Sequence, residues 1–343
     1  MALQSSGAIS LSQIETEFGG SAPTSLSEYY AAAAGIPGNN NPLSLSDFYG
    51  TASLVGIETI ATPVIINGQN SLQQITVSDY ISSGGSLSIP ASWWIWSDST
   101  SVAAMTIDIP CTIINNGKII GKGGNGAGTS GYNGGAGGPA IRINSGVSGV
   151  TIENVSGAFI AGGGGGGGTS NANAQAKGPG GGGAGGGNGG NAAGTSNQNL
   201  ATGHVGAVLN AAAAQSISVT SQTAQAGGTG GYRAENSSGT QYGRKAGGGG
   251  RILPGADCNP TVQFITQAGN IATGGAGGQN GTNGRRSGDT VIGAGGGGWG
   301  AAGGNGANGR TTNGSGGAGG KAVEDTGNTY TLTNNGTMFG ATT

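Results

Sequence analysis

The chain has 343 residues, of which 81 are glycine and 10 proline, with 5% aromatic and 8% charged residues and a formal net charge of −2. So few aromatic residues exclude a large conventional core, and so few charges exclude a highly charged disordered chain. No run of about 18 apolar residues is present, so we expect no membrane insertion. The first twelve residues lack the basic start and apolar stretch of a signal peptide, so we expect synthesis in a cytoplasm.

Charge is unevenly distributed along the chain. Residues 1–117 contain eight acids and no Lys or Arg, whereas all twelve basic residues lie in 118–343. This asymmetry predicts that the two ends face different partners, with the basic end suited to anionic surfaces.

Residues 1–50 contain a short repeat in which Ser-Leu-Ser is followed by Gln, Glu or Asp. The serines at positions 10, 25 and 44 are placed as N-caps, with a side-chain acceptor three residues on, so each unit predicts a capped helical turn. Three such turns are too small for an independent domain, and their apolar side chains need a partner. We interpret residues 1–50 as an attachment module, whose candidate contact residues are Leu11, Phe18, Leu26, Tyr29, Tyr30, Leu45, Phe48 and Tyr49.

Residues 51–118 are rich in β-branched and aromatic residues, separated by turn signals such as Asn67-Gly68 and Gly84-Gly85. This pattern predicts a small antiparallel β domain. Trp93, Trp94 and Trp96 could form a platform for sugars, but three tryptophans at a domain junction are more typical of a core or interface.

Residues 119–343 are dominated by glycine, which recurs at every third position over Gly128–Gly137, Gly275–Gly284 and Gly303–Gly309. A period of three is typical of polyproline II, which has no internal hydrogen bonds, so backbone groups must bond to neighbouring runs. The alternative is a flexible linker. A recurring motif of β segment, Asn/Gly turn and β segment at 112–121, 150–160, 264–274 and 330–340 favours ordered, laterally packed runs.

Polar, irregular insertions interrupt the glycine runs and are expected at loop tips, where binding surfaces are usually built. They mix aromatic and basic residues, which suits stacking on sugar rings and pairing with phosphates or carboxylates. The candidate binding residues are Tyr232, Arg233, Tyr242, Arg244, Lys245, Arg285, Arg286, Trp299 and Arg310.

The sequence offers no recognisable catalytic motif. The single histidine, His204, lies in a polar loop without a triad motif, and no Cys or His spacing is typical of a metal site. Gly-x-Gly-x-x-Gly matches are expected by chance in such a chain. Cys111 and Cys258 are interpreted as buried apolar residues, with a disulfide as the alternative. We therefore expect no enzyme activity, cofactor, metal or nucleic-acid binding.

The Ser-Leu-Ser units of residues 25–50 and the pattern Ile114-Asn-Asn-Gly-Lys-Ile-Ile-Gly-Lys-Gly-Gly124 resemble glycine-rich tail proteins of tailed bacteriophages. The Pro139-Ala-Ile turn and the glycine run after Phe159-Ile160 also resemble segments of these tail proteins. Glycine blocks alternating with variable loops are also similar to the adhesins of T-even-like long tail fibres. This resemblance implies a sandwich of polyglycine II helices and loops that recognise outer-membrane proteins or surface glycans.

The sequence thus predicts a mostly β and irregular fold in three parts: helical turns in 1–50, an antiparallel β domain in 51–118, and packed polyglycine II helices with small β segments and loops in 119–343. The leading hypothesis is a tail-fibre or tail-tip protein of the virion that binds a bacterial surface glycan or outer-membrane protein. Its other expected partners are virion tail proteins at the N-terminal region and further copies of itself, with a trimer as the working assumption. The alternatives are a structural or decoration protein without receptor binding and, more remotely, an ice- or crystal-surface binder.

Overall fold

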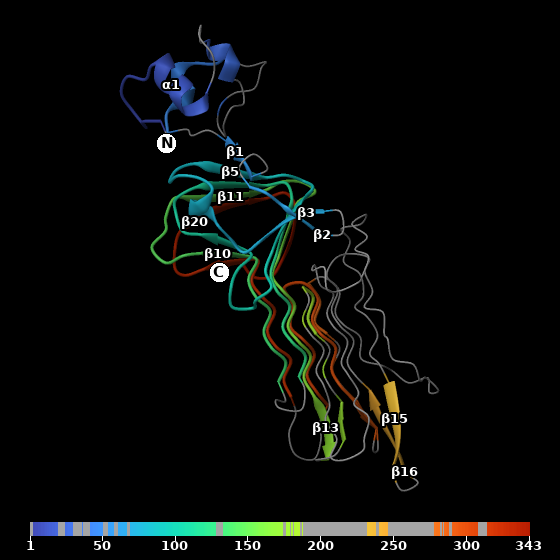
Figure 1. Cartoon of the computed structure of the whole chain (residues 1–343). Coiled ribbons are helices and arrows are strands. Elements are labelled where there is room, and N and C mark those ends of the chain that lie inside the picture. The colour runs from blue at the N-terminus through green and yellow to red at the C-terminus, as the bar shows by residue number, and fades with distance from the viewer. Residues whose placement is uncertain are drawn as a thin grey trace.

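The structure is a computed structural model. It describes residues 3–19, 25–29, 36, 42–50, 54–57, 61–66, 69–127, 133–173, 176–178, 180, 182–185, 187, 232–237, 240–245, 278–281, 283, 285–287, 290–307 and 314–343. A small helical module lies at one end of the molecule, and the strands within residues 170–178, 232–245 and 285–292 lie at the other. A body of three sheets lies between them (Figure 1).

The N-terminal module contains helix α1 (Leu11–Phe18) and two 3₁₀ turns, η1 (Leu26–Tyr29) and η2 (Leu45–Phe48). The capping predicted from the repeat is confirmed. In each unit the residue three positions after the first serine accepts a hydrogen bond from that serine's N–H group, at 2.8, 3.0 and 2.7 Å respectively. Each repeat therefore begins with the same side-chain cap, which is followed by an α-helix in the first repeat and by a 3₁₀ turn in the other two.

The equivalent apolar positions of the three repeats meet in one small cluster. Ile14, Tyr29 and Phe48 are at most 3% exposed, and Phe18 packs edge-on against Phe48 with ring centroids 5.8 Å apart. The Tyr29 hydroxyl donates to the Gly19 carbonyl at 2.9 Å. This part of the expected attachment surface is therefore used to hold the module together.

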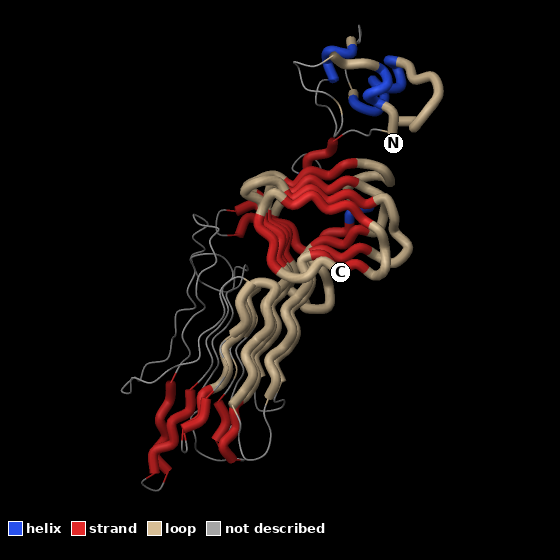
Figure 2. The backbone as a smooth tube through the Cα atoms, turned by 180° about the vertical axis from the view of Figure 1, so that it is seen from behind, coloured by secondary structure: helices blue, strands red, loops and turns tan. Residues whose placement is uncertain are grey.

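The body consists of three sheets built from short strands that the chain visits in turn, and Figure 2 shows these sheets arranged as a triangle. The first sheet has the order β1 (Leu54–Gly56), β5 (Ser86–Ile89), β8 (Thr112–Asn115), β11 (Val150–Asn154) and β20 (Tyr330–Asn334). The second has the order β2 (Val64–Ile66), β3 (Gln69–Gln73), β6 (Trp93–Trp96), β9 (Lys118–Ile120), β12 (Phe159–Ala161) and β21 (Thr337–Phe339). The third has the order β19 (Val323–Asp325), β10 (Ile141–Ile143), β7 (Met105–Ile107) and β4 (Ile75–Thr76), with the 3₁₀ turn η3 (Val77–Asp79) after β4.

This arrangement is a three-sided parallel β-helix. From β3 onwards, successive strands of each coil belong to the second, third and first sheets in turn, so each of these strands pairs with its counterpart one coil away. The expected antiparallel pairing is wrong here: in the three sheets only β2 and β3 pair antiparallel, and the other described pairs are parallel. The turns that suggested hairpins are the corners of coils, because each short strand ends where the chain bends to the next sheet.

The sheets also continue beyond residue 118, since strands within 141–161 and 323–339 extend all three of them. Alternate side chains of each strand point inward and form one buried core, including Ile113, Ile152 and Met105. An asparagine ladder occupies one corner, with Asn115 and Asn154 buried and Asn334 exposed. The side-chain amide of Asn115 donates to Asn154 at 2.9 Å, and that of Asn154 donates to Asn334 at 2.7 Å. The recurring Asn in the sequence motif is thus the corner residue of successive coils.

The glycine-rich segments leave the β-helix at one corner, between the second and third sheets. The first excursion lies between β9 and β10, and the second between β12 and β19. In Figure 2 their runs descend side by side from this corner. The β-helix therefore supplies the fixed base from which each run starts and to which it returns.

The glycine runs are held together by backbone hydrogen bonds between runs. Every third residue of run 121–127 donates its N–H group to a carbonyl of the segment 161–167, at 2.8–2.9 Å and with a constant offset of 40 residues. Run 162–168 bonds to six others, and those six bond to one another in a closed ring. In ring order they are 121–127, 133–140, 314–321, 300–307, 293–298 and the described parts of 180–187. We call these seven runs the glycine bundle.

The position of run 162–168 at the centre explains its composition of seven consecutive glycines. A Cβ atom added to any of them would lie 1.9–2.3 Å from a backbone oxygen of a surrounding run. Real Cβ atoms do not approach so closely, so only glycine fits. The outer runs accept residues such as Asn125, Ala136 and Ala318 at exposed positions.

Asparagines on the outer runs add a second kind of bridge. Their side-chain oxygens accept hydrogen bonds from backbone N–H groups of the adjacent run, as in Asn133 with Ser315 at 2.9 Å and Asn305 with Gly316 at 2.8 Å. Asn280 and Asn283 bridge to run 300–307 in the same way, at 3.1 and 2.8 Å. Asparagine is favoured there because it satisfies backbone donors that the glycine neighbours leave open.

Candidate functional site at the distal tip

The far end of the glycine bundle carries short strands from three separate insertions. The hairpin β13 (Ser170–Asn173) and β14 (Ala176–Gly178) comes from the first. The strands β15 (Tyr232–Ser237) and β16 (Thr240–Lys245) come from the second, and β17 (Arg285–Ser287) and β18 (Thr290–Ile292) from the third. Four of them form one sheet in the order β15-β16-β18-β17, and the β13–β14 hairpin lies against it (Figure 1).

This tip sheet gathers seven of the nine residues that the sequence suggested for receptor binding. They are Tyr232, Arg233, Tyr242, Arg244, Lys245, Arg285 and Arg286. The second and third insertions join through the parallel pair β16–β18, which aligns Arg244 with Val291 and Lys245 with Ile292. Residues about 40 to 50 positions apart in the sequence are thereby brought onto neighbouring strands.

A rung consists of the residues that lie directly opposite one another on neighbouring strands, and the strand pairing places six of these seven residues on two adjacent rungs. One rung contains Arg233, Arg244, Val291 and Arg286, and the next contains Tyr232, Lys245, Ile292 and Arg285. Glu235 pairs with Tyr242 further along β15 and β16. Within strands β13 to β18 the sequence has six basic residues, these five and Lys177, against the single acid Glu235.

Of the other two candidates, Trp299 alone is among the described residues. Trp299 is 3% exposed and packs against Phe159, with ring centroids 5.9 Å apart, at the base of the glycine bundle. Its indole is therefore not available at the surface, and we leave it out of the receptor surface proposed below. Arg310 lies outside the described residues, as do His204, Cys258 and the motif at 264–274.

The base of the glycine bundle is an aromatic cluster on the outer face of the second sheet. Trp94 is fully buried there with Phe159 and Trp299, and the Lys118 ammonium lies 5.0 Å from the centre of the Trp94 ring. Burial lowers the pKa of Lys118. Trp93 is buried as well, in the β-helix core, so the interpretation of these tryptophans as core rather than sugar platform is confirmed for Trp93 and Trp94.

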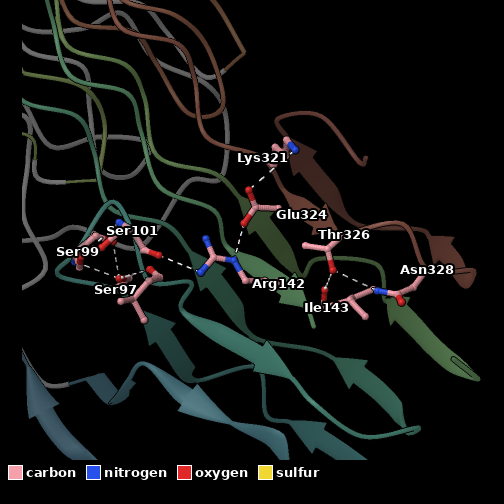
Figure 3. A network of polar contacts seen from close by, with 10 residues as sticks. Ser97, Ser99, Ser101, Arg142, Ile143, Lys321, Glu324, Thr326 and Asn328 are labelled. Carbon is pink, nitrogen blue, oxygen red and sulfur yellow. Dashed lines mark hydrogen bonds and ion pairs between the residues drawn. The ribbon is translucent and has the colours of Figure 1, made fainter. Parts of the chain in front are cut away.

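A polar network connects β10 and β19, the strands to which the first and the second glycine excursion return (Figure 3). Arg142 of β10 donates to Glu324 of β19 at 2.6 Å and to the carbonyl of Ser101 at 2.9 Å. Lys321 lies 3.9 Å from the other oxygen of Glu324, and Thr326 donates to the Ile143 carbonyl at 3.0 Å. No sequence motif indicated this network, because its members are far apart in the chain.

The described residues contain no group of acidic, His or Cys side chains suited to a metal ion. Among them, no helix is long and apolar enough to cross a membrane. Cys111 is a buried free thiol, as expected for a small apolar residue, and burial, with a smaller effect of the Asp108 carboxylate, raises its pKa to about 12.

The candidate attachment residues of the N-terminal module differ in how far they are exposed. Among its candidate residues Tyr29 and Phe48 are buried, Phe18 and Leu26 are half-buried, and Tyr30 lies outside the described residues. Leu11, Leu45 and Tyr49 are each 37% exposed and are three of the four exposed large apolar residues in the described part of the chain. They remain the candidates for contact with another protein.

A β-helix base, a glycine bundle and a basic tip sheet at the far end define a fibrous display protein, in which a long support carries a terminal surface. A family model described as phage tail fibre adhesin Gp38 matches residues 66–250, more than half of the chain. The chain therefore belongs to the phage tail fibre adhesin Gp38 family. No curated protein sequence and no solved structure matches it.

Proposed function

We propose that this phage tail fibre adhesin binds a receptor on the bacterial surface through its tip sheet, and that it acts by binding alone. The observation that carries the proposal is the convergence of seven candidate residues from two insertions on one sheet. That sheet lies at the end of the molecule opposite the N-terminal module (Figure 1). Aromatic and arginine residues suit both sugar stacking and pairing with anionic groups.

We propose that the N-terminal module attaches the chain to the tail. Leu11, Leu45 and Tyr49 support this proposal, because large apolar side chains exposed on a small module indicate a surface that another protein covers. The partner is another tail protein, which leaves the tip directed away from the particle. Several copies per virion would strengthen binding by linking weak individual contacts.

We further propose that the glycine runs are polyglycine II helices. Hydrogen bonds that recur at every third residue of run 121–127 and connect neighbouring runs support this conformation, since it has three residues per turn and no internal bonds. A bundle of such runs gives the tip a defined position without a conventional apolar core.

The test of the receptor proposal is binding of the labelled full-length protein to a panel of bacterial strains. The comparison protein has residues 232–245 and 285–290 replaced by short Gly/Ser links. Saturable binding to some strains by the native protein alone would support the proposal. Equal binding by both proteins, or none from native protein that is folded by hydrogen exchange, would contradict it and favour a structural role in the particle.

A further inference from the structure

The rung Arg233–Arg244–Val291–Arg286 breaks a general rule of sheet design. Like charges directly opposite each other on paired strands destabilise a sheet, and β15 and β16 align Arg233 with Arg244. Residues of one rung belong to the same face, and adjacent strands are about 4.8 Å apart. The register therefore places three arginine positions on one face within about three strand spacings, and a bound anion would offset the repulsion that such a register creates.

The surrounding strands neutralise this charge only in part. Glu235 is the single acid of strands β13 to β18, and it lies on the rung formed with Tyr242, two residues along from Arg233. Asp289 falls between β17 and β18 in the sequence. Together, these two acids and the six basic residues of strands β13 to β18 give the tip a net positive charge.

We propose that the arginine rung binds phosphate groups of a phosphorylated glycan on the bacterial surface; this inference rests on the receptor-binding function proposed above. Arginine binds phosphate through a planar set of N–H donors, and neighbouring arginines can share one phosphate. Arg233 and Arg244, on paired strands, form one such position. Arg286 is separated from Arg244 by the strand of Val291, so it takes a second phosphate about 10 Å away, given the usual strand spacing.

Spacing of this kind favours a glycan that carries phosphate at more than one position over a neutral sugar or a single carboxylate. A lipopolysaccharide core and a wall teichoic acid share this chemistry. An acidic loop of a surface protein is the competing ligand, and the experiment separates these sources.

The experiment measures binding of the full-length protein to immobilised lipopolysaccharide, native or dephosphorylated with hydrofluoric acid, and to wall teichoic acid. The test variant is Arg233→Gln/Arg244→Gln. The matched control is Lys177→Gln/Lys321→Gln, which removes the same charge and leaves the rung intact. Adsorption to whole cells is measured in parallel, with and without protease treatment of the cells.

We expect the native protein to bind at least one of the two native glycans, with at least a tenfold loss of affinity for the test variant and less than threefold for the control. If that glycan is lipopolysaccharide, dephosphorylation is expected to lower its affinity at least tenfold. Without ligand, the test variant should melt at the same or a higher temperature than the native protein, because it loses like-charge repulsion. Pyrophosphate at low salt should raise the melting temperature of the native protein alone.

Binding to lipopolysaccharide that survives dephosphorylation, or equal losses in the two variants, would overturn the inference. Cell binding that is abolished by protease, with no binding to either glycan, would identify a protein receptor and overturn the phosphate inference while leaving the receptor-binding function intact. Absence of binding to both cells and glycans would overturn both.

Discussion

The Nε atom of Arg142 in β10 lies 2.6 Å from the Oε2 atom of Glu324 in β19, although 182 positions separate the two residues in the sequence. Most of that interval is the second glycine excursion, which leaves after β12 and returns at β19. The ion pair thus connects strands on either side of the excursion at the point where the glycine bundle meets the β-helix.

Replacing Arg142 by alanine is expected to lower the free energy of unfolding by about 1 kcal/mol. The ion pair is partly exposed, at 30% and 26% of the two side chains, and such pairs contribute little, but the bond to the Ser101 carbonyl is lost as well. Denaturant titration measures the change. Lys321→Ala, which removes a contact of 3.9 Å, should cost less than about 0.5 kcal/mol. Equal losses in the two variants would show that the Arg142 bonds add nothing.

Gly166→Ala is expected to disrupt the glycine bundle. The new Cβ atom would lie 1.9 Å from the Asn125 carbonyl oxygen, and the obstacle is backbone, so a side-chain rearrangement cannot relieve it. We expect a loss of about 3 kcal/mol or more, at the upper end of overpacking effects. Hydrogen exchange of the glycine amides reports the change directly. Ala136→Ser, at an exposed position of an adjacent run, is the control and should leave exchange unaltered.

Asn154→Leu tests the asparagine ladder. Asn154 is fully buried, accepts from Asn115 and donates to Asn334, so the leucine leaves the buried Asn115 amide without its 2.9 Å partner. The expected cost is about 1–3 kcal/mol, the usual penalty for an unsatisfied buried polar group. Asn335→Ala, at an exposed neighbouring position, should change the melting temperature little. A stable Asn154→Leu variant would mean that the ladder is dispensable.

The buried thiol of Cys111 is expected to make the free energy of unfolding depend on pH. Its pKa is raised from 9.0 to about 12 in the fold, first by burial and then by the Asp108 carboxylate. The folded state therefore holds the thiol proton more tightly than the unfolded state, which stabilises the fold. This stabilisation is fully present below about pH 9 and is lost as the pH rises towards 12. The lowered pKa of Lys118 acts in the opposite direction, so the effect of the thiol is read as the difference between the native protein and Cys111→Ala.

The measurement is the free energy of unfolding from pH 8 to pH 11 for both proteins. Stability of the native protein should fall relative to that of Cys111→Ala over this range. Parallel curves would contradict the assignment. Below pH 9 the thiol should also resist alkylation until the protein unfolds, because the thiolate is the reactive form.

The attachment proposal predicts that Leu11→Ser/Leu45→Ser abolishes incorporation into particles while leaving cell binding by the free protein intact. Both side chains are 37% exposed, so their loss should not unfold the module. Complementation of a phage that lacks this protein, followed by detection of the protein in purified particles, measures the effect. Ser27→Ala, an exposed position of the middle repeat, is the control. Normal incorporation of the double variant would place the attachment surface elsewhere.

Local features of this protein could be predicted from the sequence. The capped turns follow from a serine and an acceptor three residues later, a relation that lies within one helical turn. The burial of Trp94 and Cys111 follows from residue type. The parallel pairing could not be predicted, because a strand of three to five residues alternates in the same way whether its partner is parallel or antiparallel.

The candidate tip residues were found by composition, since aromatic and basic residues interrupt the glycine runs. Trp299 shares this composition but is buried against Phe159, because the turn that carries it lies at the base of the glycine bundle and not at its tip. Position along a run cannot be judged from the sequence without knowing how many runs there are and which way each one travels.

That an ordered glycine run must pack against neighbouring backbone follows from the amino-acid sequence alone, because run 162–168 has no side chain with which to form a core. Three features instead depend on the three-dimensional fold. Run 162–168 lies at the centre of six others, and the strands before and after the glycine excursions belong to the same three sheets. The third feature is the rung that Arg233, Arg244 and Arg286 share. Most of the pairings behind them join segments about 40 to 180 residues apart. The hydrogen bonds that make such pairs are the same for any glycine run or short strand, so the choice of partner is set by the whole fold rather than by local sequence.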